Sequence, residues 1–224
     1  MAQKRPVVYR KRAKRACRLA KAAMAAEAIG TIQPGTDVMI MTFGQFSLID
    51  ALVHIIEQIG PADVDLATWT AYDTHLERSA ELVESSEIKR FRMVVDRSFY
   101  ARNPDFYGHM VKLFGPECVR ELRIHAKFMV LRSARSDVVV RTSMNLNENR
   151  RLENIEISED AGLADFMVGL VDGIFDEAGE GDHRSAMLEL AGHADCNPFK
   201  EIQADLIPRE HLNVANATHA IKKL

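Results

Sequence analysis

The chain has 224 residues, 47% of them hydrophobic, which is enough to bury the core of one domain, alone or with appendages. Its net charge of −3 is unevenly distributed, because residues 1–21 hold nine of the 29 basic residues and none of the 32 acidic ones. The remaining 20 basic and 32 acidic residues give the rest of the chain a net charge of −12. The longest apolar run after the basic start is too short and too rich in alanine for a signal peptide or a membrane span. We therefore expect a soluble, cytoplasmic protein without a membrane partner.

The three cysteines lie far apart and match neither a disulfide framework nor a metal-binding pattern. They are interpreted as free thiols in a reducing compartment, which agrees with a cytoplasmic location. The histidines show no His-x-x-x-His spacing, so the sequence predicts no bound metal.

A basic segment opens the chain, and we predict that residues 1–34 form an N-terminal arm that is helical from about Tyr9. Strong helix formers occupy most positions from there onwards. The cations of the arm can follow a phosphate backbone, so we assign substrate binding to four of them: Lys11, Arg12, Lys14 and Arg15. A solvated helix, a disordered arm and a transit peptide are the other interpretations of this segment.

Apolar runs and amphipathic segments alternate between residues 35 and 124. The continuous apolar runs predict buried strands, at Asp37–Phe43, Val64–Ala71, Phe91–Val95 and Val119–Ile124. The segments between them predict helices: one that Ser47 caps and Gly60 ends, a polar and exposed one at Thr74–Ser86, and one at Asp105–Phe114. After a predicted hairpin, a last helix is expected at Leu163–Phe175. This order predicts an α/β layered sheet with helices on its faces.

The composition changes after Asp176, where a linker with two glycines begins. Residues 179–224 carry no recognisable motif and are interrupted by Pro198 and Pro208. This C-terminal extension is interpreted as a dimerisation arm, a partner site or a flexible end, and the sequence does not choose among the three.

The stretch from His125 to Ile157 carries the chemistry of the chain. Its three short apolar runs are predicted strands, at Phe128–Leu131, Val138–Val140 and Ile155–Ile157. A polar turn joins the first two, which is typical of a β-hairpin. If the three strands are neighbours, the polar residues that flank them converge on one spot.

Five polar residues of this stretch are candidates for a shared catalytic site: His125, Lys127, Ser143, Asn145 and Glu156. A strand places residues two apart on one face, which aligns His125 with Lys127, and Ser143 with Asn145. An imidazole can attack phosphorus or protonate a leaving oxygen near neutral pH. Lysine, serine and asparagine can hold phosphate oxygens as charge develops on them, and a carboxylate can orient the imidazole. The set therefore suits phosphodiester chemistry.

This ordered set resembles the HKD motif of the phospholipase D superfamily, in its single-motif, endonuclease-like branch. The family pattern is His-x-Lys, four residues, Asp, six residues and Gly-Ser-x-Asn, and this chain has its His, Lys, Ser and Asn in that order, with Asn154 and Glu156 downstream. The resemblance covers roughly residues 35–178, which we assign as the catalytic domain, and is most specific over residues 119–157. It implies an α-β-α sandwich with a mixed, largely parallel central sheet.

Three departures from the family pattern bear on activity. Arg132 stands where the family has Asp, and Thr142 stands where it has the Gly before the Ser. The gap between Lys127 and Ser143 is three residues longer than in the pattern, which a longer hairpin turn accounts for. We expect Asp137 to replace the missing Asp in part.

Enzymes of this superfamily place two His-x-Lys sets around one phosphate, whereas this chain has one set. The resemblance therefore implies a homodimer with its site on the two-fold axis, the symmetry that small oligomers prefer. One His125 would attack phosphorus, and the partner's His125 would protonate the leaving oxygen. The lysine, serine and asparagine would hold the oxygens, and Glu156 would orient His125. Because the lysines supply positive charge, we expect no metal and no other cofactor.

The single-motif relatives implied by the resemblance are mostly bacterial, plasmid or phage nucleases, and the basic arm favours a polyanion. The main hypothesis is a metal-independent endonuclease acting on DNA, with RNA as a second substrate. Arg150 and Arg151 are assigned to a second phosphate, with a solvated pair as the equal alternative. Two other functions stay open: a phospholipase D-type lipid phosphodiesterase, and a catalytically disabled nucleic-acid-binding or assembly protein, which Arg132 and Thr142 suggest.

Overall fold

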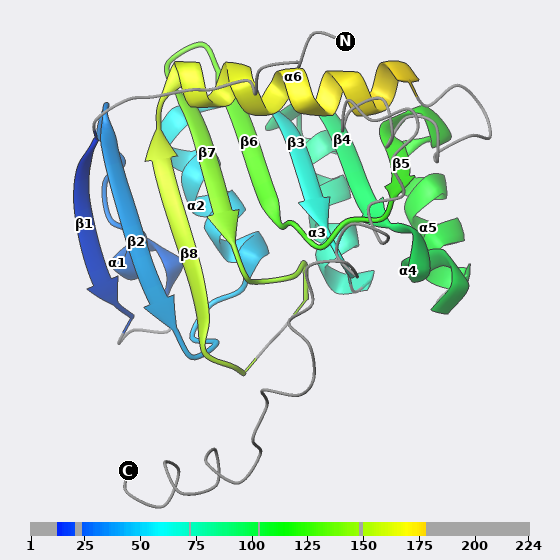
Figure 1. Cartoon of the computed structure of the whole chain (residues 1–224), viewed down its shortest axis with the longest axis horizontal. Coiled ribbons are helices and arrows are strands. Elements are labelled where there is room, and N and C mark those ends of the chain that lie inside the picture. Colours follow the sequence, from blue (N-terminus) through cyan, green and yellow to red (C-terminus); the bar gives the residue numbers. More distant parts are fainter. Residues whose placement is uncertain (1–12, 21–23, 72, 103, 148–149, 178–224) are drawn as a thin grey trace, which may run out of the picture. The chain divides into compact units, whose positions relative to one another are not determined.

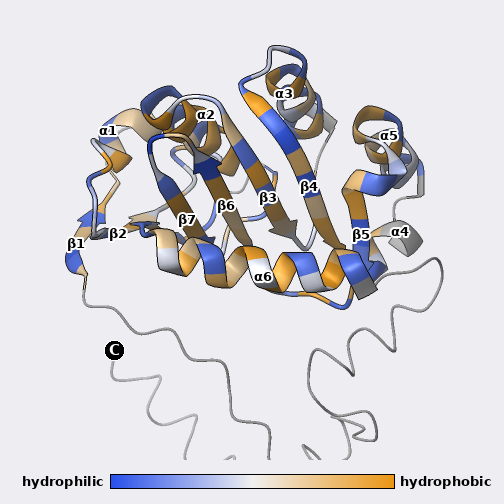
Figure 2. Cartoon of the chain, turned by 90° about the horizontal axis from the view of Figure 1, so that it is seen from above, coloured by the Kyte–Doolittle hydropathy of each residue, from blue (hydrophilic) through white to orange (hydrophobic). Residues whose placement is uncertain are grey.

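The computed structural model describes residues 13–20, 24–71, 73–102, 104–147 and 150–177. These residues form three layers: an eight-stranded sheet, one long helix across one face, and several helices on the other face (Figures 1 and 2). The predicted α/β class and the α-β-α sandwich are confirmed. The C-terminal extension assigned to residues 179–224 lies outside the described residues, and so do Lys11 and Arg12.

The sheet is mixed, and its strands follow the order β1-β2-β8-β7-β6-β3-β4-β5. Three neighbouring pairs are parallel and four are antiparallel, so parallel pairing is less dominant than expected. The reason is that β6, β7 and β8 form an antiparallel meander between β2 and β3. The strands are β1 (Lys14–Leu19), β2 (Thr36–Thr42), β3 (Ala62–Thr68), β4 (Ile88–Asp96), β5 (Val119–Leu122), β6 (Phe128–Ser133), β7 (Asp137–Thr142) and β8 (Glu153–Glu159).

The two ends of this sheet differ in what they carry. Strands β2, β3, β4 and β7 end where β6 and β8 begin, at the lower edge in Figure 1. We call this edge the carboxyl end of the sheet and the opposite edge the amino end.

Six α-helices accompany the sheet in the described residues: α1 (Ala25–Ile29), α2 (Leu48–Ile59), α3 (Asp73–Glu84), α4 (Arg97–Arg102), α5 (Pro104–Phe114) and α6 (Ala161–Glu177). Helix α2 begins at the predicted cap, where Ser47 Oγ accepts from Asp50 N (3.3 Å) and the Asp50 carboxylate accepts from Ser47 N (2.8 Å). It ends at Gly60, whose φ of 81° favours glycine. None of the helices described here is long and apolar enough to cross a membrane.

The N-terminal segment differs from the sequence-based prediction. Residues 14–19 form the edge strand β1 rather than a helix, because their backbone pairs in parallel with residues 36–41. The side chain of Arg18 extends from this strand, and its Nη1 donates to the carbonyls of Ala28 (3.0 Å) and Ile29 at the end of α1. Tertiary pairing thus overrides local helix propensity in this segment.

Apolar cores lie on both faces of the sheet (Figure 2). The larger core joins the sheet to α2, α3 and α5, and α3 is less exposed than predicted because it buries Leu76 and Leu82. The smaller core lies under α6, whose Ala164 and Val171 contact the sheet. Ion pairs hold α6 in place as well: Arg92 with Asp172 (2.7 Å) and Arg132 with Asp165 (2.9 Å).

Candidate active site

Two adjacent strands bring four of the predicted catalytic residues to the carboxyl end of the sheet. Lys127 directly precedes β6 and Ser143 directly follows β7, and the two strands pair as the predicted hairpin. The backbone N–H of Thr142 donates to the carbonyl of Lys127 (3.1 Å), which ties the two strand ends together. His125 lies two residues before Lys127, and Asn145 two residues after Ser143.

Lys127 is the most enclosed of the four side chains, with 8% of its surface exposed. Its Nζ donates to the backbone carbonyl of His125 (2.9 Å). Burial lowers the pKa of Lys127, and the negative charge of Glu153 offsets part of that decrease. An ammonium held in this way is a fixed positive charge that can stabilise charge developing on a phosphate oxygen.

Ser143 is fixed by the first residues of β8. Its hydroxyl donates to the carboxylate of Glu153 and accepts from the backbone N–H of Asn154 (2.9 Å). The backbone N–H of Ser143 donates to the carbonyl of Asn154 (3.1 Å). Glu153 is itself buried, at 9% exposed, so one carboxylate serves both the hydroxyl and the ammonium of Lys127.

Glu156 does not join this site, so the prediction for it is wrong. Side chains alternate along β8, which puts Glu153 on the face of Ile155 and Glu156 on the opposite face. There Glu156 pairs with Arg141 Nη2 (3.1 Å). The sequence held a signal for Glu153, because it shares the two-residue spacing of the buried Ile155 and Ile157.

His125 is exposed and lies beside the end of β3. Its ring is tilted by 55° against that of Trp69, with 6.2 Å between the centroids, so the half-buried Trp69 borders the site. Asp96, at the end of β4, accepts from the backbone N–H of Ile124 (3.1 Å). The segment that carries His125 is therefore held by two strands, β4 and β6.

The residues that depart from the family pattern have structural roles. Thr142 Oγ1 donates to the carbonyl of Asn154 (2.6 Å) and accepts from Met144 N (2.9 Å), so this side chain braces the loop after β7. Arg132 pairs with Asp137 (3.4 Å) at the amino end of the sheet. Asp137 thus lies directly opposite the position of the family Asp, and its partial replacement of that residue stays a prediction.

Asn145 has a buried polar atom that the structure leaves unused. Its Oδ1 has no hydrogen-bond partner among the described residues. A buried acceptor in this state costs about 1–3 kcal/mol, so it is usually explained by strain or by a missing ligand or water. Because Oδ1 can only accept, a contact of Asn145 with a phosphate oxygen would use its amide nitrogen.

The basic residues assigned to substrate lie at both ends of the sheet. Arg150 and Arg151 are exposed and precede β8, which places them at the carboxyl end near Ser143. Lys14 and Arg15 are not brought to the site, because they begin β1 opposite the start of β2, at the amino end. Six strand residues separate the two ends, a span of roughly 20 Å.

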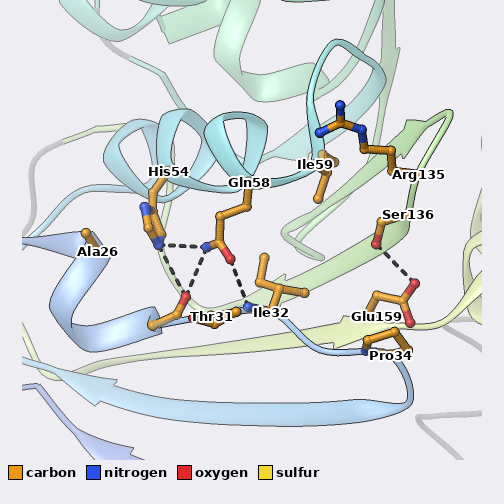
Figure 3. A pocket seen from close by; sticks show the side chains of 11 residues that line it. Ala26, Thr31, Ile32, Pro34, His54, Gln58, Ile59, Arg135, Ser136 and Glu159 are labelled. Carbon is orange, nitrogen blue, oxygen red and sulfur yellow. Dashed lines mark hydrogen bonds between the residues drawn. The ribbon is translucent and has the colours of Figure 1, made fainter.

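A pocket of about 610 Å³ lies near the amino end, between α2, the loop before β2 and the β6–β7 turn (Figure 3). Its polar groups bond largely to one another. Gln58 Nε2 lies 2.8 Å from His54 Nε2 and donates to the carbonyl of Gly30 (3.0 Å), and Ser136 Oγ donates to Glu159 (3.0 Å). His54 thus has a structural environment, and the pocket is separate from the candidate site.

The side chains of the described residues show no cluster of three or more histidine, cysteine or acidic groups that could hold a metal ion. Positive charge at the candidate site comes from Lys127, with Arg150 and Arg151 nearby.

Comparison with known proteins finds no matching family model and no matching curated protein. Among solved structures, the chain is similar to polyphosphate kinase from Porphyromonas gingivalis, with 13% identity and a TM-score of 0.48 over 72% of this chain and 30% of that one. It is also similar to phosphatidylserine synthase from Haemophilus influenzae Rd KW20, with 16% identity and a TM-score of 0.44 over 65% of this chain and 41% of that one. The match therefore spans less than half the length of either protein.

Proposed function

We propose that this protein is a metal-independent phosphodiesterase of the phospholipase D type, and that it acts as an endonuclease on DNA. The observation that carries the proposal is the arrangement of the buried Lys127 ammonium and the Ser143–Glu153 hydrogen bond next to the exposed His125. One phosphate can meet a nucleophile, a cation and a hydroxyl at this end of the sheet. The exposed Arg150 and Arg151 add positive charge that favours a polyanion.

Two copies of the chain share each phosphate in the proposed mechanism. The imidazole of one His125 attacks phosphorus, which forms a P–N bond and breaks the bond to the leaving oxygen in line with it. The partner's His125 donates a proton to that oxygen. The same imidazole then removes a proton from water, whose oxygen attacks phosphorus and breaks the P–N bond.

The other site residues hold the phosphate and one another. Lys127, Ser143 and Asn145 are proposed to bind the non-bridging oxygens as negative charge develops on them. Glu153 acts as a positioning residue, because its carboxylate binds the Ser143 hydroxyl and lies near the Lys127 ammonium.

The test is cleavage of supercoiled plasmid DNA by the purified full chain in excess EDTA. We expect the wild-type protein to nick the plasmid and His125→Ala to lose more than the roughly 10²–10⁴-fold typical of a lost general acid or base, because the covalent route disappears. His109→Ala, on α5, is the matched control and should retain activity. A folded His125→Ala variant with wild-type activity would overturn the assignment.

A lipid phosphodiesterase is the second candidate, because large apolar side chains are exposed at the same end of the sheet. Phe43 is 57% exposed and Leu152 is 58% exposed. Headgroup release from phospholipid vesicles by the wild type but not by His125→Ala, without plasmid cleavage, would favour it. Plasmid binding with neither cleavage nor headgroup release would favour a disabled nucleic-acid-binding protein.

A further inference from the structure

Trp69 borders the candidate active site and belongs to neither of the two apolar cores of the described residues. It is the only tryptophan of the chain. Tryptophan carries a large apolar surface and is highly buried on average. The side chain of Trp69 is instead half-buried, and its ring centroid lies 6.2 Å from that of the exposed His125. This aromatic surface beside the proposed nucleophile therefore needs an explanation other than core packing.

The backbone around Trp69 is fixed on both sides. Thr68, the last residue of β3, is buried, and its hydroxyl donates to the carbonyl of Thr70 (2.8 Å) and accepts from Leu146 N (3.3 Å). Ala71 forms a β-bridge with Leu146, in the loop after β7. A surface that is held in place in this way loses little conformational freedom when a ligand binds to it.

Exposed cations lie on both sides of Trp69 at the carboxyl end of the sheet. Arg97 follows β4 and Arg123 follows β5, on one side of β3. Arg150 and Arg151 precede β8, on the other side. The sheet order puts five strand spacings of about 4.8 Å between β8 and β5, so these cations span roughly 24 Å. That distance corresponds to roughly seven nucleotides at about 3.4 Å for each stacked nucleotide.

We propose that the substrate is single-stranded DNA and that Trp69 stacks on the base next to the cleaved phosphate, an inference that rests on the proposed function. A phosphate at His125 has its nearest base one sugar away, which brings that base within reach of the indole. Proteins that bind single strands combine a basic track for the backbone with aromatic side chains for the bases. Trp69 is a specificity-determining residue in this arrangement and takes no part in making or breaking bonds.

The indole distinguishes single strands from duplexes, whereas the cations do not. Arginine side chains bind the phosphates of either form. In a duplex the faces of each base are covered by its neighbours, so an aromatic ring beside the phosphate cannot stack unless a base step is forced open. Negative supercoiling favours such opening, so a supercoiled plasmid remains a substrate. We expect single-stranded DNA to be cut fastest and relaxed duplex DNA slowest.

The first experiment measures cleavage of a single-stranded oligonucleotide in EDTA by the wild type, Trp69→Leu and Trp69→Phe. Leucine keeps an apolar side chain without a π-face, whereas phenylalanine keeps the π-face. We expect Trp69→Leu to raise KM by about tenfold or more, as for the loss of one stacked base, and to leave kcat within about threefold. Trp69→Phe should restore most of the lost affinity, and both variants should match the wild type on relaxed duplex DNA. Circular dichroism checks the fold of each variant.

The second experiment uses Trp69 as its own reporter, because the chain has no other tryptophan. In the full chain carrying His125→Asn, which should not cleave, titration with the single strand should quench the indole fluorescence, since a stacked base contacts the ring face. A strand of the same length without bases and a duplex of the same sequence are the matched controls. Both should bind through their phosphates and leave the fluorescence unchanged.

The outcomes separate this inference from the proposed function. Quenching by the single strand but by neither control, in a protein that never cuts DNA, supports the stacking site and removes the nuclease. Equal kcat/KM of the wild type and Trp69→Leu on single strands, in a protein that cuts DNA, overturns the stacking site alone. Quenching by phosphatidylcholine–phosphatidylglycerol vesicles and by no oligonucleotide would assign Trp69 to a lipid surface and also overturn the inference.

Discussion

The hydroxyl of Ser143 donates to the carboxylate of Glu153, across the boundary between β7 and β8. This bond matters because the same carboxylate also counteracts the effect of burial on the pKa of Lys127. Glu156 lies three residues further along β8 on the opposite face of the sheet, where it pairs with Arg141. The two acids of one strand therefore have separate roles.

We expect Glu153→Gln to reduce phosphodiesterase activity by about 100-fold, because the hydroxyl of Ser143 loses its charged partner and Lys127 loses a neighbouring negative charge. Glu156→Gln is the matched control, three residues along β8 on the opposite face, and should stay within about threefold of the wild type. Initial rates on plasmid DNA in EDTA measure both. The reverse ranking of the two variants would return the role of the positioning carboxylate to Glu156.

The pH dependence of activity should show the ionisation of Lys127. Phosphate binding needs the charged ammonium, and burial lowers the pKa of Lys127, so activity should fall on the alkaline side below the range of an ordinary lysine. Glu153→Gln should move this limb to still lower pH, because Glu153 raises the pKa. A pH–rate profile of the wild type and Glu153→Gln checks both shifts. An alkaline limb that does not move in Glu153→Gln would exclude Lys127 as its source.

The lowered pKa of Lys127 also makes the stability of the fold depend on pH. The unfolded chain holds the Lys127 proton more tightly than the folded protein does, so stability rises with pH between the lowered folded pKa and the ordinary one. Below that window the buried ammonium costs free energy. Lys127→Met should therefore raise the thermal midpoint at neutral pH while it abolishes activity.

The sequence predicted the layered fold because its signals were local. The apolar run at residues 37–43 and the cap at Ser47 depend on near neighbours, and β2 and α2 confirm them. The segment at residues 14–19 was predicted as a helix because its propensity is helical, whereas its strand state depends on pairing with residues 36–41. No local pattern reports such a pairing.

The sequence predicted the site residues at the hairpin, but not which glutamate of β8 joins them. His125, Lys127, Ser143 and Asn145 adjoin one hairpin, so their spacing was sufficient to place them together. The choice between Glu153 and Glu156 depended on which face of β8 meets the larger core; the spacing of Ile155 and Ile157 indicated that face, but the sequence does not show that the Ser143 hydroxyl lies on it.

The basic arm should help with long substrates and not with short ones. Deletion of residues 1–12 removes five cations and leaves β1 intact, whereas a deletion through residue 21 would remove a strand of the sheet. Because the arm joins β1 at the amino end, roughly 20 Å from the site, only DNA of many nucleotides can reach both.

We expect the truncated protein to bind long DNA with a shallower salt dependence, by about 0.9 in the slope of log K for each lost phosphate contact. Cleavage of a short oligonucleotide should not change. Replacement of Arg150 and Arg151 by alanine is the control and should weaken binding of both lengths. If the slope of log K against log salt concentration is the same before and after truncation, the arm does not take part in DNA binding.

The buried ion pair between Asp65 and Arg92 should be important for stability. Asp65 is 2% exposed, and its carboxylate accepts from Arg92 Nε (2.7 Å) and Nη2 (2.8 Å). Asp65→Asn removes the buried one of the two carboxylates that pair with Arg92, while Asp172 remains, and should cost about 1.5–3 kcal/mol in unfolding free energy. Asp63→Asn, two residues earlier on β3 and 39% exposed, should cost less than about 1 kcal/mol. Urea denaturation of both variants makes the comparison.

A subunit-mixing experiment tests the shared site. If both His125 imidazoles of a dimer serve one phosphate, a heterodimer of wild type and His125→Ala should be inactive. Equal amounts of the two chains, allowed to exchange, should then leave about one quarter of the activity of the same total wild-type protein, since about one dimer in four is wild type on both sides. Independent sites, or a monomer in which His109 is the acid, would leave about one half. An exchange-blocked mixture is the control and should give one half in either case. A quarter under exchange together with a half without it would require that the two copies complete each other's site.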